Sequence, residues 1–202
     1  MIRVSLKPRK CRSCGVVFQR QRSMQSVCSP ACAAALAAKQ RAQKEARARK
    51  DERKSLAERK AKLKTRREWI AEAQSSFNAY VRERDFGMGC ISCGLLPKQI
   101  FGGAVDCGHF RSVGSAQQHR FNLKNCAAQC VKCNRFLGSN SVEMRKGMVA
   151  RFGIEAVEAL EADQSTRRFD IEYLSRIKRI FRKKARRAKA RRERESETRY
   201  AA

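Results

Sequence analysis

The sequence has few aromatic residues, few acidic residues and no long apolar run. Of its 202 residues, aromatic side chains make up 7%, and only three prolines and two histidines occur. No apolar segment approaches the roughly 20 residues that a transmembrane helix needs, and the N-terminal residues MIRVSLKPRKC contain no apolar core of a signal peptide. We therefore expect a soluble cytosolic protein, in which reducing conditions favour metal-bound thiols over disulfides.

Positive charge, in contrast, is abundant. The chain has 47 Lys and Arg against 19 Asp and Glu, which gives a net charge of +28 at neutral pH. Nucleic acid is the partner class that fits such an excess best. A membrane surface is the competing interpretation, but the basic runs lack the continuous stripe of large apolar residues that interfacial insertion requires. We expect a nucleic-acid partner and no membrane partner.

Apolar residues occur in short blocks, and 33% of all residues are charged, so no large core is predicted. Such a chain is typical of small modules in which metal binding supplies folding free energy that apolar burial does not. Ten cysteines are present, and eight of them form two sets of four.

One of these sets encloses a long segment. It consists of Cys90, Cys93, Cys130 and Cys133. Two C-x-x-C pairs supply four thiolates for a tetrahedral zinc site. Ordinary zinc ribbons leave about 15 to 20 residues between the pairs, whereas the longer segment 94–129 here contains the sequence DCGHF. The spacing predicts a structural zinc ion that braces a folded segment with chemistry of its own.

The other set lies near the N-terminus and also predicts a structural zinc ion. It consists of Cys11, Cys14, Cys28 and Cys32. Ser29 and Pro30 are typical of a helix N-cap and a first helical residue. Two interpretations stay open, namely a purely structural zinc fold and a DNA-contacting finger. The arginines of the module favour the second; they are Arg12, Arg20 and Arg22.

Two helices of different character are predicted next. Residues 33–68 contain no Gly or Pro and almost no apolar face, which indicates a solvated spacer helix or a basic rod along phosphates. From Trp69 the apolar period becomes helical and ends before the turn at Gly87 and Gly89. The stripe predicts a packing helix that walls the second zinc module, although Trp69 and Tyr80 could instead stack on bases. Its members are Trp69, Ala73, Phe77, Tyr80 and Val81.

Within the second zinc module, the residues Ile100 to Asp106 and Phe110 to Val113 are predicted to form two short strands separated by glycine turns. His109 follows Gly108 directly. Asn125 lies five positions before Cys130, and Asn134 follows Cys133 at the expected start of a helix.

This order of zinc pairs, histidine and asparagines resembles the HNH, or ββα-metal, nucleases over residues 69–140. More narrowly, five segments are similar to the phage NinG family, also called Rap: RERD at 82–85, CISCG at 90–94, DCGHF at 106–110, RFNLKNCAAQCVKCN at 120–134 and GSN at 138–140. The resemblance covers most of the chain. It implies endonuclease action on branched recombination intermediates such as Holliday junctions and D-loops.

The resemblance also implies residue roles. His109 would be the general base that activates water. Asp106 and Asn134 would bind a catalytic Mg²⁺ or Mn²⁺, and Asn125 would orient His109 or pin the hairpin loop. Endonuclease VII-type resolvases share such a zinc-braced site. The chain departs from that pattern because Asp106 lies three residues before His109 rather than next to it.

Each of these residues also has a structural interpretation. His109 could be a structural loop residue, Asp106 could cap a turn, and Asn134 could be a plain helix N-cap. The second histidine, His119, is expected to contact phosphate or to lie on the surface. The two remaining cysteines are expected to be small buried fillers; they are Cys107 and Cys126.

The C-terminal part is predicted to be helical. Residues 142–152 and 154–161 should form two short helices broken at Gly153, which cover the core. Asp170 should cap a last helix with the apolar stripe Ile171, Leu174, Ile177 and Phe181. Beyond Arg182 the stripe vanishes, and we expect a tail that is disordered alone and helical on DNA, or else a merely solubilising tail.

The predicted fold class is α+β and mostly helical, with a small zinc-braced HNH-like core and long basic helices. We predict an N-terminal zinc module at 1–33, a basic helical linker at 34–68, a nuclease domain at 69–150 and a helical region with a basic tail at 151–202.

The predicted function is hydrolysis of branched or four-way DNA by a metal-dependent endonuclease. The protein should carry two structural Zn²⁺ and one catalytic Mg²⁺ or Mn²⁺, recognise shape rather than sequence, and act as a homodimer with phage or host recombination proteins in the bacterial cytoplasm. Predicted DNA contacts are Arg111, Arg120, Lys132, Arg135 and the basic stretch around Lys183. The alternative is a non-catalytic basic zinc protein that binds DNA or RNA.

Overall fold

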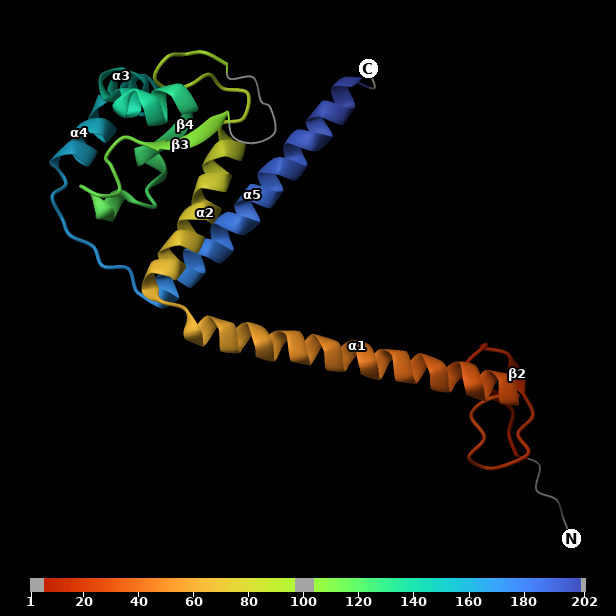
Figure 1. Cartoon of the computed structure of the whole chain (residues 1–202). Helices are drawn as coiled ribbons and strands as arrows, with labels where there is room; N and C mark the ends of the chain where they lie inside the picture. The colour runs from red at the N-terminus through yellow and green to blue at the C-terminus, as the bar shows by residue number, and fades with distance from the viewer. Residues whose placement is uncertain (1–5, 97–103, 201–202) are drawn as a thin grey trace, which may run out of the picture. The chain divides into compact units, whose positions relative to one another are not determined.

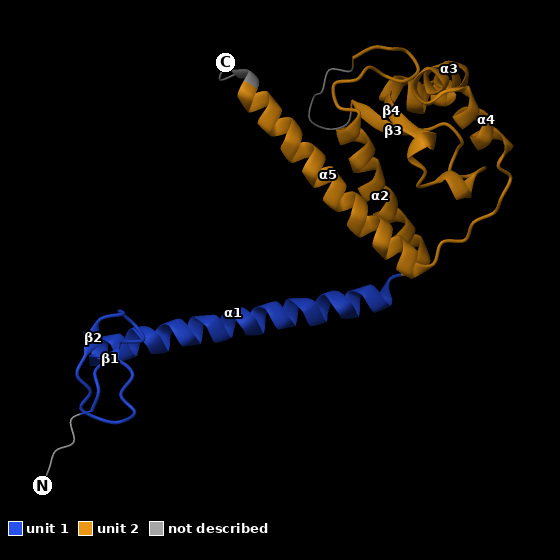
Figure 2. Ribbon diagram, turned by 180° about the vertical axis from the view of Figure 1, so that it is seen from behind, with its two compact units in different colours: residues 1–64 blue, residues 65–202 orange. Residues whose placement is uncertain are grey.

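A computed structural model describes residues 6–96 and 104–200. By its internal contacts the chain divides into two compact units, residues 1–64 and residues 65–202 (Figure 2). The structure is mostly helical, with two small sheets of two strands each among the described residues. Within the same residues, no helix is long and apolar enough to cross a membrane.

The first unit contains a small hairpin and one long helix. Strand β1 (Arg9–Lys10) pairs antiparallel with β2 (Val17–Phe18), and α1 (Pro30–Leu63) follows. The side chain of Ser29 accepts a hydrogen bond from the backbone N–H of Cys32, 3.2 Å away, which confirms the predicted N-cap. None of the residues of α1, all of which the structure describes, is buried.

The long helix ends earlier than the composition of residues 33–68 suggests. A second helix, α2 (Arg66–Arg84), begins directly after α1 because Thr65 and Glu68 form a capping box. The hydroxyl of Thr65 accepts from the N–H of Glu68, and the Glu68 carboxylate accepts from the N–H of Thr65 at 2.7 Å. These reciprocal bonds satisfy N–H groups that a continuous helix would satisfy along its axis.

Helix α2 packs through the predicted stripe, of which Trp69, Ala73, Phe77 and Val81 are buried. The packing role is therefore confirmed. The partner is α5 (Ile171–Tyr200), which runs alongside α2 (Figure 1) and is capped by Asp170, whose carboxylate accepts from the N–H of Tyr173 at 2.6 Å.

Helix α5 continues through the basic tail, so the prediction of a disordered tail is wrong for this structure. Its apolar stripe does end near Phe181, the ring of which lies 4.8 Å from that of Phe77. Beyond that point, Arg192 pairs with Glu83 of α2 at 3.2 Å, and two ion pairs of i,i+4 spacing support the exposed turns.

The second sheet joins β3 (Val105–His109) to β4 (Cys126–Cys130) in antiparallel register. The predicted strand at residues 110–113 is wrong, because these residues form bends and turns. The Asn125 side chain takes the place of a strand partner: its oxygen accepts from the N–H of Arg111 at 2.7 Å, and its nitrogen donates to the Arg111 carbonyl at 3.0 Å. Residues 100–103 of the other predicted strand lie outside the described residues.

The two faces of this sheet are covered by different helices. Helix α2 lies against one face. Helices α3 (Ser141–Phe152) and α4 (Ile154–Ala162) cover the other, where Ala127, Met144, Met148 and Val157 form a core cluster. The two helices are separated at Gly153, as predicted, where φ is +86°.

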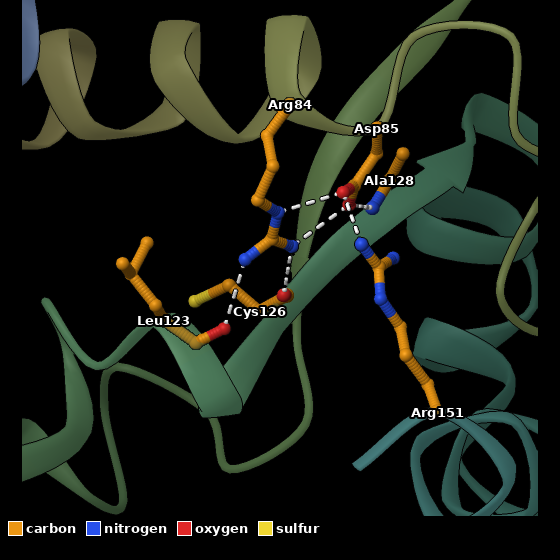
Figure 3. A network of polar contacts seen from close by, with 6 residues as sticks. All are labelled: Arg84, Asp85, Leu123, Cys126, Ala128 and Arg151. Carbon is orange, nitrogen blue, oxygen red and sulfur yellow. Dashed lines mark hydrogen bonds and ion pairs between the residues drawn. The ribbon is translucent and has the colours of Figure 1, made fainter. Parts of the chain in front are cut away.

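A buried carboxylate ties the end of α2 to β4 and α3 (Figure 3). Asp85 accepts two hydrogen bonds from the guanidinium of Arg84, at 2.7 and 2.8 Å, and one from the N–H of Ala128 at 2.9 Å. Arg151 of α3 also bonds to it. Burial alone would raise the pKa of Asp85, but the bonds from Arg84 and Arg151 outweigh burial and lower it.

Candidate functional site

The N-terminal cysteine cluster has the geometry of a tetrahedral metal site. Its four Sγ atoms lie within 4.8 Å of one another, and the Sγ of Cys28 is 3.6 Å from that of Cys14 and 3.5 Å from that of Cys32. Zinc–sulfur bonds of about 2.3 Å at tetrahedral angles require sulfurs about 3.8 Å apart. A hydrogen bond from the backbone N–H of Cys14 is the largest of the effects that lower the pKa of Cys11 to about 6. The cluster could therefore hold zinc structurally.

The second cluster links the turn after α2 to the end of β4. The Sγ atoms of Cys93 and Cys130 are 3.9 Å apart, and all four ligand atoms again lie within 4.8 Å. Burial raises the pKa of Cys90. Hydrogen bonds from the N–H groups of Cys130, Cys93 and Ser92 have a larger opposite effect, so the pKa is lowered to about 7. The N–H of Cys133 also donates to the Cys130 sulfur at 3.4 Å. Zinc here would brace both ends of the segment that carries His109.

Strand β3 places the predicted site residues on two different faces. Side chains alternate along a strand, so Cys107 and His109 share one face, and Asp106 lies on the other. Two observations agree with this assignment. The ligand atoms of Cys107 and His109 cluster with that of Cys126, whereas a Cβ added at Gly108 would meet the side chain of Gln129, the partner of Asp106 in the ladder.

His109 faces α2. Its Nε2 atom lies 3.3 Å from the carbonyl oxygen of Arg120 and 3.3 Å from the side-chain nitrogen of Gln74, and its ring centroid is 6.3 Å from that of Phe77. Burial is the main cause that lowers the pKa of His109. The imidazole is therefore neutral near pH 7, as a general base must be.

An arginine-lined cavity of about 760 Å³ lies next to His109. Gln74 and Arg120 line the cavity and also contact His109, and the guanidinium of Arg120 donates to the side-chain oxygen (Oε1) of Gln74 at 3.3 Å. The other lining residues all come from α2; they are Arg66, Arg67, Ile70, Ala71, Ser75, Asn78 and Arg82.

The sequence predicted Arg120 as a DNA contact but missed the α2 members of this cavity. The signal was the recurrence of Arg67, Gln74, Asn78 and Arg82 at helical spacing, which the apolar stripe beside it outweighed. Of the cationic groups in this cavity, Arg120 lies next to His109, which ends strand β3.

Asp106 and Asn134 lie together, as a shared metal site requires. The side-chain nitrogen of Asn134 donates to the Asp106 carboxylate at 2.9 Å, and Arg135 binds both carboxylate oxygens, at 2.7 and 2.8 Å. The Arg135 hydrogen bonds are the main cause that lowers the pKa of Asp106. A carboxylate and an amide oxygen suit Mg²⁺ or Mn²⁺. The two residues could hold such an ion only with the guanidinium of Arg135 displaced and the Asn134 amide turned so that its oxygen, and not its nitrogen, faces Asp106.

Asn125 is fully buried and fixes the loop that follows His109. Besides its two bonds to Arg111, it donates to the carbonyl oxygen of His119 at 3.3 Å. His119 itself is 6% exposed, and its Nε2 lies 3.4 Å from an Asp163 carboxylate oxygen. The expected surface position of His119 is therefore wrong, because this side chain packs under the loop.

The predicted DNA contacts are spread over several segments. Lys132, Arg135 and Lys183 are exposed, whereas Arg111 and Arg120 are half-buried. The two leftover cysteines are buried, as predicted: Cys107 is 8% exposed and Cys126 is 0% exposed.

The chain is similar to a set of phage proteins along most of its length. A family model described as Bacteriophage Lambda NinG protein matches residues 3–193. Protein ninG of Escherichia phage lambda is 34% identical over 189 residues, which cover 87% of this chain and 91% of that protein. The Salmonella phage P22 protein of the same name gives the same values, and that of Enterobacteria phage H19B is 35% identical over 181 residues, covering 84% and 88%. No solved structure matches.

Proposed function

Since the chain belongs to the bacteriophage NinG family, we propose that it is a metal-dependent, structure-specific endonuclease acting in phage recombination. It would hydrolyse phosphodiester bonds in branched DNA such as Holliday junctions and D-loops. The observation that carries the proposal is the position of the neutral His109. Its Nε2 contacts Gln74 and Arg120, and these two residues line an arginine-rich cavity.

In this proposal, the cavity on α2 receives the DNA backbone. Arg66, Arg67 and Arg82 supply positive charge to successive phosphates, and the half-buried Arg120 supplies charge close to His109. Charge contacts of this kind hold a duplex without reading its bases. In this step His109 adopts the tautomer with its proton on Nδ1, so that Nε2, no longer held by the Arg120 carbonyl, accepts the proton of the attacking water.

Asp106 and Asn134 would hold the catalytic Mg²⁺ or Mn²⁺. Such an ion stabilises negative charge on the phosphate that is attacked and on the oxygen that leaves. Arg135 is 60% exposed and can exchange Asp106 for a DNA phosphate. Strand β3 pairs only with β4 among the described residues, and in this proposal groups from both faces of β3 act on one phosphodiester at its other edge.

The remaining features support binding to branched DNA. The net charge is +28, and the chain has one basic helix before the zinc-braced sheet, α1, and one after it, α5. In this proposal both helices contact phosphates. Binding should therefore fall steeply as salt rises. A two-fold symmetric junction would be cut most simply by a homodimer, together with phage or host recombination proteins in the bacterial cytoplasm.

A second function is favoured by one observation. Asp106 is engaged by Arg135 and lies on the opposite face of β3 from His109. That arrangement suits a non-catalytic basic zinc protein that binds DNA or RNA, in which Asp106 locks η3 (Lys132–Phe136) to the sheet.

The two functions differ in the effect of His109→Ala. Wild type and variant would be incubated with a labelled four-way junction and with the matching linear duplex, in Mg²⁺, Mn²⁺ or chelator. The nuclease proposal expects metal-dependent cutting of the junction by wild type, a loss of at least about 100-fold in the variant, and equal junction binding by both.

A matched control is Lys183→Ala, which removes an exposed positive charge on α5 and leaves the surroundings of His109 intact. It should weaken binding slightly and leave the cutting rate of bound junction unchanged. Binding by wild type without cutting under every metal condition would overturn the nuclease proposal in favour of the binding protein.

A further inference from the structure

A third group of metal-ligating side chains lies outside the two four-cysteine clusters. The ligand atoms of Cys107, His109 and Cys126 all lie within 4.8 Å of one another. In the ladder His109 is opposite Cys126, and Cys107 is opposite Ala128, so the three side chains share one face of the sheet. The register that forms the sheet therefore also assembles the group.

We propose that Cys107, His109 and Cys126 form a third metal site, which takes soft divalent ions such as Zn²⁺ and Cd²⁺ and which blocks His109 when it is occupied. Two thiolates and a neutral imidazole are the ligand set that such ions prefer. The hard ions Mg²⁺ and Mn²⁺, in contrast, prefer oxygen ligands. The site thus discriminates between the ion proposed for catalysis and a competing ion.

The burial of the group is compatible with a bound ion. Cys126 is 0% exposed and Cys107 is 8% exposed, so an isolated charge would be costly there. Two thiolates, however, carry a charge of minus two, which a divalent ion cancels. The occupied site is neutral overall, and small side-chain rotations bring the sulfurs to the separation of about 3.8 Å that tetrahedral zinc requires.

Three protein ligands leave a fourth position for water or another donor. The Gln74 side chain and the Arg120 carbonyl oxygen lie near His109. Both residues line the arginine-rich cavity, from which we expect an ion to reach the site. We therefore expect an exchangeable ion that binds more weakly than the ions of the four-cysteine clusters.

The consequence for catalysis rests on the proposed function. An imidazole nitrogen that binds a metal ion has no lone pair left to accept a proton. Excess Zn²⁺ should therefore inhibit junction cleavage in the presence of saturating Mg²⁺, and removal of the two thiols should relieve this inhibition because His109 alone holds zinc poorly.

Metal binding is tested first and without any nuclease assay. Wild type and the Cys107→Ala/Cys126→Ala double variant would be saturated with Zn²⁺ and their bound zinc counted by native mass spectrometry. The wild type is expected to bind one ion more than the double variant, and this additional ion should release about two protons from the thiols. Equal zinc content in the two proteins would overturn the proposed site.

Since both cysteines are buried, the double variant could fail to fold, and its Trp69 fluorescence must match that of wild type. His109→Asn supplies a second test, because it removes one ligand and keeps both thiols; it should weaken the additional ion at least tenfold. Unchanged affinity in this variant would exclude His109 from the site.

The cleavage assay then separates the two proposals. Zinc inhibition of wild type but not of the double variant supports the block of His109. If wild type with the additional zinc ion bound still cleaves the junction at its full rate, the proposal that zinc blocks His109 is overturned. If wild type never cleaves the junction, the proposed nuclease function fails, whereas the zinc count still decides whether the site exists.

Discussion

The carboxylate of Asp85 is predicted to be among the most costly side chains to remove from the second unit outside its four-cysteine cluster. It is fully buried, and it is bonded to two arginine side chains that are only 19% and 20% exposed. Asp85→Ala would leave Arg84 and Arg151 with an uncompensated charge, and the N–H of Ala128 would lose its acceptor.

The magnitude follows from these contacts. Removal of one partner of a buried ion pair lowers the free energy of unfolding by about 3–5 kcal/mol, and a buried N–H group without an acceptor lowers it by about 1–3 kcal/mol. The terms overlap, because both arginines can turn partly toward water, so we expect a loss of about 4 kcal/mol in the free energy of unfolding. For a urea m-value of about 2 kcal/mol/M, the midpoint should fall by about 2 M.

Trp69, the only tryptophan in the sequence, lies in the second unit and reports its unfolding by fluorescence. The measurement is a urea titration with zinc present. Asp170→Ala is the matched control, because it removes an aspartate that caps a helix end from the solvent side and should cost only about 1 kcal/mol. A midpoint for Asp85→Ala equal to that of the control, with unchanged m-value, would refute the reasoning.

The same network predicts a pH dependence. The pKa of Asp85 is lower in the folded protein than its ordinary value of 3.8. Its contribution to stability is therefore fully present above that ordinary pKa and is lost as the pH falls through the lowered folded pKa. The stability difference between wild type and Asp85→Ala should stay constant from neutral pH to about pH 5 and shrink in stronger acid.

Three further predictions follow from the site. Arg135→Gln frees the carboxylate of Asp106 and should tighten Mn²⁺ binding severalfold in calorimetry without DNA; unchanged affinity would mean that Arg135 does not compete for that position. Arg66→Ala combined with Arg67→Ala should weaken junction binding and reduce the salt slope by about 2, roughly one for each lost phosphate contact, and an unchanged slope would exclude the cavity from DNA binding. Zinc chelation should lower the thermal midpoint of the second unit by more than 10 °C, since about 1 kcal/mol shifts such a domain by roughly 2–4 °C and structural zinc contributes far more; Cys130→Ser should reproduce that loss.

Local signals in the sequence predicted much of the helical structure. Ser29, Asp170 and Gly153 mark helix ends by side-chain capping or by a left-handed backbone, and such effects depend only on neighbouring residues. The four-cysteine sets were equally readable, because ligand spacing restricts the geometry of a zinc site.

Long-range pairing was harder to predict. The partner of β3 lies beyond a loop that Asn125 holds through the backbone of Arg111, and no periodicity in residues 110–113 distinguishes such a loop from a strand. The opposite faces of Asp106 and His109 follow from strand alternation only after the strand bounds are known. The cavity on α2 was missed because the apolar stripe beside its polar residues dominated the helical pattern, although those residues also recur at helical spacing.

Helix α1 can act as a molecular ruler. Its 34 residues, at about 1.5 Å each, give a rod about 51 Å long, which equals the length of about 15 base pairs of duplex DNA. Because no residue of the rod is buried, its length is free of packing constraints, and removing seven residues, or two turns, keeps the helical phase. A change in this span should therefore have little effect on the stability of either cysteine cluster, so that the length of the rod can vary independently of the metal-binding residues.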